Sequence, residues 1–203
     1  MIKNNYPGKF IVFEGLDGSG QSTQVSLLRD YLIKKGHQVF ATKEPTLDSE
    51  AGRKLRQALD EKAKLDPAEL QKLFVEDRAE HLKNQIIPAL KEGKFVISDR
   101  YFFSTFAFGS SDGLDLEWLI KLNDNFLLPD IAFILKTSPR VCVERIEKRG
   151  TAKTLFEKEA KLAKVWEAYK IMPERFKEAV IIEGEKPINE VFEEVKKVLE
   201  NKL

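Results

Sequence analysis

Residues 15–22 have the spacing of a loop that binds phosphate. Their sequence, Gly-Leu-Asp-Gly-Ser-Gly-Gln-Ser, matches the pattern G-x-x-x-x-G-K-[ST] at every defined position except the lysine. Glycines let backbone N–H groups turn toward phosphate oxygens, and a helix that begins at the loop adds the positive end of its dipole. The alternative is a glycine-rich turn without function. We predict phosphate contacts from Gly15, Asp17, Gly18, Ser19, Gly20, Gln21, Ser22 and Thr23.

The position of the missing lysine bears on catalysis. A lysine there would supply positive charge to the β- and γ-phosphates during transfer, whereas the amide of Gln21 can only donate a hydrogen bond. Loss of one preorganised donor costs on the order of 10² to 10³ in rate in other enzymes. We therefore expect nucleotide binding with slow transfer, and a gain in turnover on the order of tenfold or more from Gln21→Lys. The hydroxyl of Ser22 is expected to bind Mg²⁺.

A second polar pair, Asp99 and Arg100, follows the apolar run at residues 95–98. Ligands of parallel α/β sheets bind at the carboxyl ends of the strands, so this pair is predicted to face the loop. Asp99 could hold Mg²⁺ through water, and the planar fork of Arg100 could hold a second phosphate. A local ion pair at the end of a strand is the alternative.

Short apolar runs alternate with helical patterns along the whole chain. We expect strands at residues 9–14, 38–42, 95–98, 131–135 and 179–182. We expect helices from about residue 20 to 36, around residue 104, and at 50–59, 67–90, 115–127, 139–149, 157–172 and 188–199. The strands lack the alternation of a sheet with one wet face. This order predicts an α/β fold in three layers, with a five-stranded parallel sheet and helices on both faces. Without a linker or repeat, residues 1–203 are expected to form one domain.

Composition excludes several classes of protein. The 203 residues carry a net charge of +1, which gives no broad field for binding nucleic acid or a membrane surface. The longest apolar run, residues 131–135, is far short of the roughly 20 residues that span a bilayer. No secretory signal is evident, so we expect a cytoplasmic protein. The single cysteine, Cys142, is expected in the core or on a helix surface, and not as a nucleophile.

Further motifs give the chain a resemblance to the thymidylate kinase family from about residue 10 to the C-terminus. The most specific are F-E-G-L-D-G-S-G at 13–20, T-K-E-P at 42–45, L-F-V-E-D-R-A-E-H-L at 73–82, D-R-Y at 99–101 with Ser104 and Thr105, and L-P-D at 128–130. The resemblance implies a P-loop NTPase fold, ATP and dTMP as substrates, Mg²⁺ as cofactor, and a homodimer. The implied reaction yields dTDP and ADP for dTTP biosynthesis.

The resemblance also assigns residues to the acceptor nucleotide. Phe74 and Arg78 stand four apart on one helix face, and the family places such residues against the thymine ring and its O4 atom. Cytosine offers an amino donor there, which would leave it and Arg78 unpaired. The alternative is that Phe74 belongs to the core and Arg78 is a solvated residue.

Five other positions are assigned to dTMP by similarity alone. Thr105 matches a short polar residue that meets the base, and Phe108 matches an aromatic residue beside the sugar. Asp17 is similar to an acid near the 3′-hydroxyl, while Pro45 shapes the monophosphate pocket. Glu157 completes this set.

A basic segment near residues 145–157 resembles the mobile lid that covers ATP in this family. The family takes a catalytic arginine from the loop or from the lid, and the loop has none here. Arg149 is our first candidate and Arg145 our second, although positive charge also favours the C-terminal end of any helix. The lid departs from the family at Thr154 and Leu155, where an Asp-Arg pair is usual.

Three functional hypotheses follow. The leading one is a dTMP kinase that uses Mg-ATP and has Arg100, Asp99, Arg149 and Gln21 at the reacting phosphates. A catalytically weak nucleotide-binding relative is the second, and it is motivated by Gln21 and the altered lid. A kinase of a different nucleoside monophosphate is the third.

Overall fold

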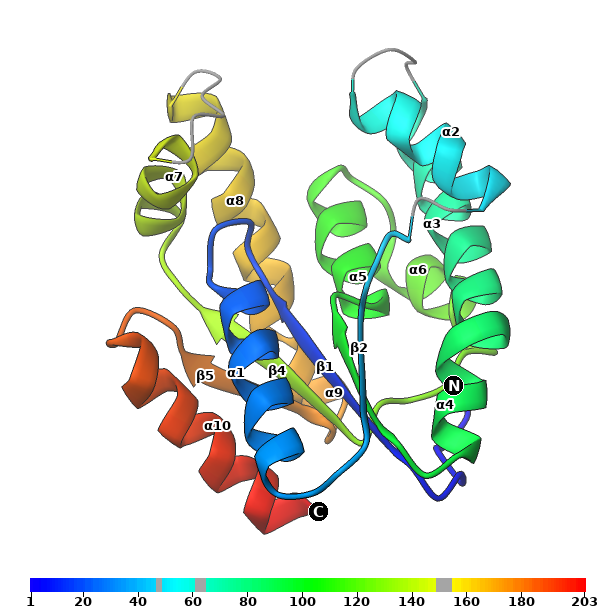
Figure 1. Ribbon diagram of the computed structural model, residues 1–203. Coiled ribbons are helices and arrows are strands. Elements are labelled where there is room, and N and C mark those ends of the chain that lie inside the picture. The colour runs from blue at the N-terminus through cyan, green and yellow to red at the C-terminus, as the bar shows by residue number, and fades with distance from the viewer. Residues whose placement is uncertain (47–48, 61–64, 149–154) are drawn as a thin grey trace.

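Five parallel strands form a single sheet in the order β2-β3-β1-β4-β5 (Figure 1). The structure is a computed structural model that describes residues 1–46, 49–60, 65–148 and 155–203, without the side chains of 155–158. The strands are β1 Lys9–Gly15, β2 Val39–Lys43, β3 Phe95–Asp99, β4 Ile131–Lys136 and β5 Ala179–Glu183. The predicted five-stranded parallel sheet is confirmed, and each strand ends one residue later than predicted.

Helices connect the strands and cover both faces of the sheet (Figure 1). They are α1 Gln21–Lys34, α2 Glu50–Leu59, α3 Pro67–His81, α4 Ile87–Lys91, α5 Phe102–Ser111, α6 Leu116–Leu122, α7 Pro139–Glu147, α8 Leu155–Lys170, α9 Met172–Arg175 and α10 Ile188–Lys202. Within the described part of the chain, no helix is both long and apolar enough to cross a membrane.

The strand β1 shows how the three layers are built. Ile11 and Phe13 point to one face, where they pack in a cluster with apolar residues of α1 and α10. Phe10 and Val12 point to the other face and pack with residues of α5 and α8. Successive side chains of a strand point to opposite faces, so an unbroken apolar run is buried on both sides.

The predicted helix at 67–90 is interrupted. A π-helical turn, η1 Leu82–Ile86, separates α3 from α4. Pro88 lies in the first turn of α4 and has no N–H to continue the hydrogen-bond ladder. Apolar residues continue at helical spacing across η1, so the sequence pattern predicted a single uninterrupted helix over 67–90.

The predicted helix at 115–127 ends early, because α6 stops at Leu122. The side chain of Asn123 is buried and donates to the carbonyl of Leu119, 2.8 Å away. Asparagine and aspartate at 123–125 compete with helical hydrogen bonds through their short polar side chains. The chain therefore leaves the helix at Asn123.

The helices α3 and α1 begin in different ways. The helix α3 has a capping box in which Asp66 accepts from the N–H of Glu69 at 2.8 Å and Glu69 accepts in return. The helix α1 begins at Gln21, directly after Gly20 with φ 104°, and no side chain in the described residues caps it. The N-terminus of α1 is thus open toward a ligand at the carboxyl edge of the sheet.

Candidate active site

The predicted phosphate loop joins β1 to α1 and is closed by a hydrogen bond from the N–H of Ser19 to the carbonyl of Leu16, at 3.0 Å. Gly18 has φ 87°, and a Cβ there would lie 2.6 Å from the carbonyl oxygen of Cys142 in α7. Only glycine fits this approach. Cys142 is buried, which decides between the two predicted positions in favour of the core, and burial raises the pKa of its thiol to about 12.

The two residues predicted to bind the metal meet at the carboxyl end of β3. The Ser22 hydroxyl donates to Oδ2 of Asp99 at 2.5 Å, and the Asp99 side chain is buried. Hydroxyl and carboxylate oxygens are ligands that suit Mg²⁺, which commonly takes few protein ligands and completes its shell with phosphates and water. Among the described residues, no group of three or more His, Cys, Asp or Glu could hold a metal. The pair therefore fits a metal that arrives with a nucleotide.

Arg100 is held in an uncommon backbone conformation. Its φ is 77°, in the left-handed region that costs a non-glycine residue about 1 to 3 kcal/mol. The Arg100 N–H donates to the carbonyl of Phe13 at 2.9 Å, and the Ser98 hydroxyl donates to the carbonyl of Arg100 at 2.7 Å. These contacts fix the strand end from which the side chain turns toward the loop.

The guanidinium of Arg100 joins the phosphate loop to α5. One nitrogen, Nη1, donates to the carbonyl of Gly15 at 3.1 Å and to the hydroxyl of Ser104 at 2.9 Å. The other, Nη2, donates to Asp17 at 2.6 Å and to Oε1 of Gln21 at 3.2 Å. Burial alone would lower the pKa of Arg100, but nearby carboxylates, Asp17 foremost, raise it above its usual value. The group therefore keeps its charge.

Glu14 is a buried acid that the sequence analysis did not assign to the site. Its carboxylate accepts from the N–H of Tyr101 at 2.8 Å, the hydroxyl of Ser104 at 2.6 Å and the hydroxyl of Tyr169 at 2.9 Å. Burial raises the pKa of Glu14 from 4.5 to about 7, against the opposing effects of Arg100 and these hydrogen bonds. Its sequence signal is an acid at the end of the apolar run 9–14.

Glu14 should make stability depend on pH. Because folding raises its pKa from 4.5 to about 7, the free energy of unfolding should fall as pH rises through this window. The shift corresponds to about 3 kcal/mol in total. In Glu14→Gln this part of the pH dependence should vanish, which urea unfolding at pH 5 and pH 8 would measure. The exposed control Glu117→Gln should keep the slope of the unaltered chain, and an equal slope in Glu14→Gln would contradict the assignment.

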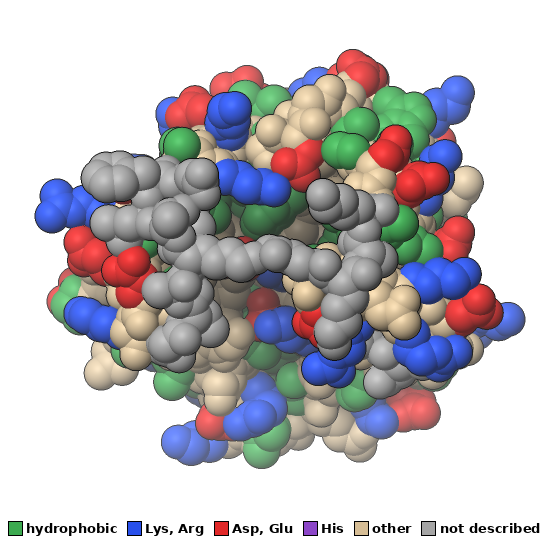
Figure 2. Space-filling view, turned by 90° about the horizontal axis from the view of Figure 1, so that it is seen from above, with side chains coloured by type: hydrophobic (Ala, Val, Ile, Leu, Met, Phe, Trp, Pro, Cys, Tyr) green, Lys and Arg blue, Asp and Glu red, His purple; other side chains and the backbone are tan. Residues whose placement is uncertain are grey.

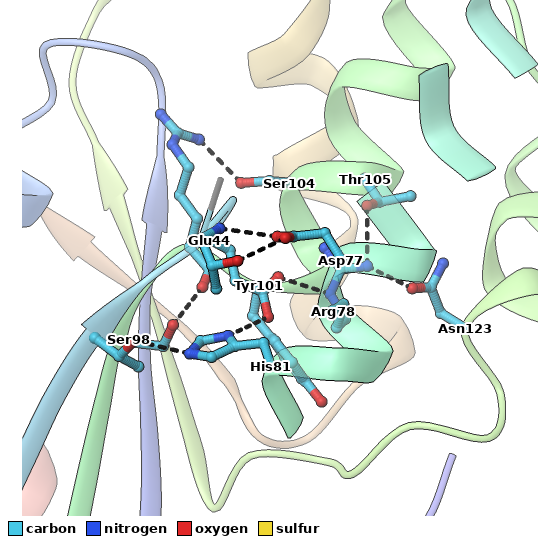
Figure 3. A network of polar contacts seen from close by, with 12 residues as sticks. Glu44, Asp77, Arg78, His81, Ser98, Tyr101, Ser104, Thr105 and Asn123 are labelled. Atoms are coloured by element: carbon cyan, nitrogen blue, oxygen red, sulfur yellow. Dashed lines mark hydrogen bonds and ion pairs between the residues drawn. The ribbon is translucent and has the colours of Figure 1, made fainter. Parts of the chain in front are cut away.

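Arg78, on α3, lies in a buried network of polar contacts (Figure 3). Its Nε donates to Oε2 of Glu44 at 2.8 Å, and its Nη1 donates to Asn123 at 2.7 Å and to Thr105 at 3.2 Å. The Arg78 side chain is only 2% exposed, so the alternative of a solvated residue was wrong. Buried arginines require such partners, because an unpaired buried charge is costly.

The network around Arg78 contains residues that the sequence analysis left out. His81 contacts Glu44 through Nδ1 at 3.1 Å and Thr42 through Nε2 at 2.7 Å (Figure 3). These contacts give His81 a structural role in the network. Little in the sequence indicated that Asn123 and Glu44 contact the predicted site residues. Glu44 appeared only within the motif at 42–45, and Asn123 lay inside a predicted helix.

The segment that carries Pro45 is attached to α3 by Asp77. This buried carboxylate accepts from the N–H of Thr46 at 2.8 Å, from the Thr46 hydroxyl at 2.6 Å and from the hydroxyl of Ser49 at 2.8 Å. Ser49 in turn caps α2 by accepting from Gly52. Pro45 therefore stands beside the helix that carries Phe74.

The predicted aromatic residues of the acceptor side remain partly exposed. Phe74 is half-buried on α3, one turn before Arg78. Phe108 is half-buried on α5, and its ring centre lies 5.4 Å from the guanidinium carbon of Arg100. Thr105 is buried against Arg78. Thr105 and Phe108 both lie on α5, so this helix contacts Arg78 through one residue and Arg100 through the other.

A cavity of about 170 Å³ lies on the other side of the phosphate loop. Its lining includes Gly18, Arg145, Gly184 and Ile188, of which the last two were not predicted. Arg145 donates to the carbonyls of Ser19 at 3.3 Å and Gly18 at 3.4 Å. The second lid candidate therefore contacts the loop backbone. Gly184, which comes shortly after the fifth predicted strand, is the feature of the sequence that could have indicated this cavity.

Several predicted residues cannot be located. Arg149 and Thr154 lie outside the described residues, and the side chains of Leu155 and Glu157 are likewise not described. On the face viewed from above in Figure 2, acidic and basic side chains are interspersed. Within the site, Arg100 pairs with Asp17 at 2.6 Å.

Comparison with known proteins agrees with this geometry. A family model described as thymidylate kinase matches residues 13–195. A protein of Pyrococcus horikoshii named "Probable thymidylate kinase" is 41% identical over 202 residues, with 97% of this chain and 98% of the relative covered. A thymidylate kinase of Leptospira interrogans is 42% identical over 196 residues, covering 95% and 94%. One of Caldicellulosiruptor saccharolyticus is 40% identical over 202 residues, covering 97% and 98%. This chain belongs to the thymidylate kinase family.

Proposed function

We propose that this chain transfers the γ-phosphoryl group of ATP to dTMP, giving dTDP and ADP for dTTP synthesis. The observation that carries the assignment is the position of Arg100. Its guanidinium contacts Gly15 of the phosphate loop and Ser104 of α5, the helix that also carries Thr105 of the Arg78 network. A cation at this junction can meet both an acceptor phosphate and a donor phosphate.

Catalysis by this arrangement depends on position and charge. The loop 15–23 would surround the donor phosphates with N–H groups, and Arg100 would hold the acceptor phosphate in line with them. Ser22 and Asp99 would hold Mg²⁺, which when bound neutralises charge on the β- and γ-oxygens. Gln21 lacks the charge of a lysine, so we expect turnover to be slow.

The acceptor base would be selected beside Arg78. Phe74 would stack on thymine, while Arg78 and Thr105 would meet its polar edge. Asp17, Pro45, Phe108 and Glu157 are proposed for the sugar and monophosphate because of the resemblance. The burial of Arg78 supports this proposal, because its hydrogen bonds to Glu44, Thr105 and Asn123 fix the orientation of the guanidinium.

A coupled assay of ADP release tests the proposed substrate. With dTMP, dUMP, dCMP, dGMP and AMP as acceptors, we expect the highest kcat/KM for dTMP and a dCMP value lower by about tenfold or more, because of the mismatch at Arg78. A KM for dCMP equal to that for dTMP would remove the thymine assignment. Faster turnover of another monophosphate would favour a kinase of that substrate.

Other features are proposed from the resemblance. Arg149 is the proposed catalytic arginine of a lid near 145–157, because Arg145 is engaged with the loop carbonyls. We also propose a single domain over 1–203, a cytoplasmic location and a homodimer. Sedimentation of the purified chain would test the homodimer.

A further inference from the structure

Both ends of the Gln21 amide are used inside the protein. Its Nε2 donates to the carbonyl of Gly15 at 3.2 Å, and its Oε1 accepts from Nη2 of Arg100 at 3.2 Å. The orientation of the amide is fixed, because a carbonyl oxygen can only accept and a guanidinium can only donate. The Gln21 side chain is buried, with 6% of the residue exposed. A lysine at this position could not accept from Arg100.

Three groups form a closed set of contacts at this point. Arg100 also donates through Nη1 to the carbonyl of Gly15, at 3.1 Å, so Gly15, Gln21 and Arg100 each contact the other two. Gly15 ends β1, Gln21 begins α1 and Arg100 follows β3. The set therefore connects the start of the helix that faces a donor phosphate with the arginine proposed for the acceptor phosphate.

Arg100 brings a positive charge to this position. The phosphate loop has no lysine at position 21, and the guanidinium of Arg100 lies within hydrogen-bond distance of the residue that replaces it. Arg145 contacts the loop elsewhere, at the carbonyls of Gly18 and Ser19. A planar guanidinium has five N–H donors, and the contacts described above use the four on Nη1 and Nη2. The Nε–H is left for a phosphate, and a second N–H becomes available where a phosphate oxygen replaces one of these acceptors.

We propose that Gln21 is a positioning residue for Arg100, whose single guanidinium serves both the acceptor phosphate and the loop that lacks lysine. This inference rests on the proposed role of Arg100 in holding the acceptor phosphate. It differs from the expectation based on sequence, in which the Gln21 amide donates directly to a phosphate of ATP. The two accounts predict effects on different substrates.

The first test compares dTMP with thymidine. Gln21→Met keeps the length of the side chain and removes the amide, and binding can be measured by calorimetry without ATP. We expect dTMP affinity to fall about tenfold, as for a lost hydrogen bond to a charged group, and thymidine affinity to stay unchanged. An equal loss for both, or no loss for dTMP, would overturn the inference. If the unaltered chain did not prefer dTMP over thymidine, the proposed role of Arg100 would fail as well.

A double-mutant cycle tests whether Gln21 acts through Arg100. In the background of Arg100→Lys, Gln21→Met should weaken dTMP binding by less than twofold, because lysine lacks the fork that Gln21 holds. The matched control is Gln24→Met, three residues along α1, whose amide donates to the carbonyl of Ile188. This control should leave the ratio of dTMP to thymidine affinity unchanged. A full tenfold effect of Gln21→Met in both backgrounds would overturn the inference.

Kinetic constants give an independent test. Gln21→Lys should raise the KM for dTMP about tenfold even if the added charge raises turnover, because the acceptor for Arg100 is lost. An unchanged KM for dTMP in this variant would overturn the inference. Direct donation from Gln21 to ATP predicts instead that Gln21→Met raises the KM for ATP and spares that for dTMP.

Discussion

Replacement of Arg100 by lysine should lower kcat/KM for dTMP by on the order of 10² to 10³, the range seen when one preorganised donor to a developing charge is removed. The side chain makes contacts with four groups, at Gly15, Ser104, Asp17 and Gln21. A lysine keeps the charge but lacks the planar guanidinium, in which Nη1 and Nη2 each donate to two of these groups. Steady-state kinetics with ATP held at saturation would measure the effect.

Binding separates phosphate recognition from general damage in this variant. Affinity for dTMP should fall much more than affinity for thymidine, since thymidine has no phosphate for Arg100 to hold. The matched control is Arg140→Lys, an exposed arginine on α7 that pairs with Glu144. It should leave both affinities unchanged. If Arg100→Lys weakened thymidine as much as dTMP, phosphate recognition by Arg100 would be disproved.

Replacement of Arg78 by methionine should lower the free energy of unfolding by about 3 to 5 kcal/mol. The substitution leaves Glu44 buried with its main partner removed, and a buried uncompensated charge has this cost in other proteins. The double variant Arg78→Met with Glu44→Gln should recover most of this loss, because no buried charge is left unpaired. Urea unfolding of the two variants and the unaltered chain gives the comparison.

The same pair of variants separates folding from base recognition. The stable double variant should still lose the preference for dTMP over dCMP, because it lacks the guanidinium that would meet O4 of thymine. Arg29→Met, at an exposed position on α1, should change neither stability nor preference by a measurable amount. A double variant that is stable and still prefers dTMP would refute the role of Arg78 in base selection.

Local pattern determined the positions of the strands and of the phosphate loop. Apolar runs such as 9–14 and 131–135 are long enough for strands and too short for helices, and the glycines between 15 and 20 end the first one. Parallel strands share one carboxyl edge, so Asp99 and the loop could be placed together before any contact was known. The contact of Ser22 with Asp99 agrees with that placement.

Helix ends were harder to predict, because they depend on single residues within a periodic pattern. Pro88 removes one N–H inside the predicted helix 67–90, yet the apolar spacing continues across it. Asn123 ends α6 partly through a partner, Arg78, that stands 45 residues earlier in the chain. A contact between residues so far apart in the chain cannot be predicted from a local sequence pattern.

The sequence by itself determined the parallel α/β sheet and the position of the loop 15–22, since these follow from spacing along the chain, whereas the acceptor-site residues were predicted from the resemblance to a family. Only the tertiary structure decided the environment of each side chain. Burial of Glu14 raises its pKa to about 7, and the contact of Gln21 with Arg100 joins residues 79 positions apart. Desolvation and hydrogen bonding depend on which distant segments pack together. One sequence-based hypothesis placed Arg78 in solvent. The packing of distant segments instead buries it and pairs it with Glu44.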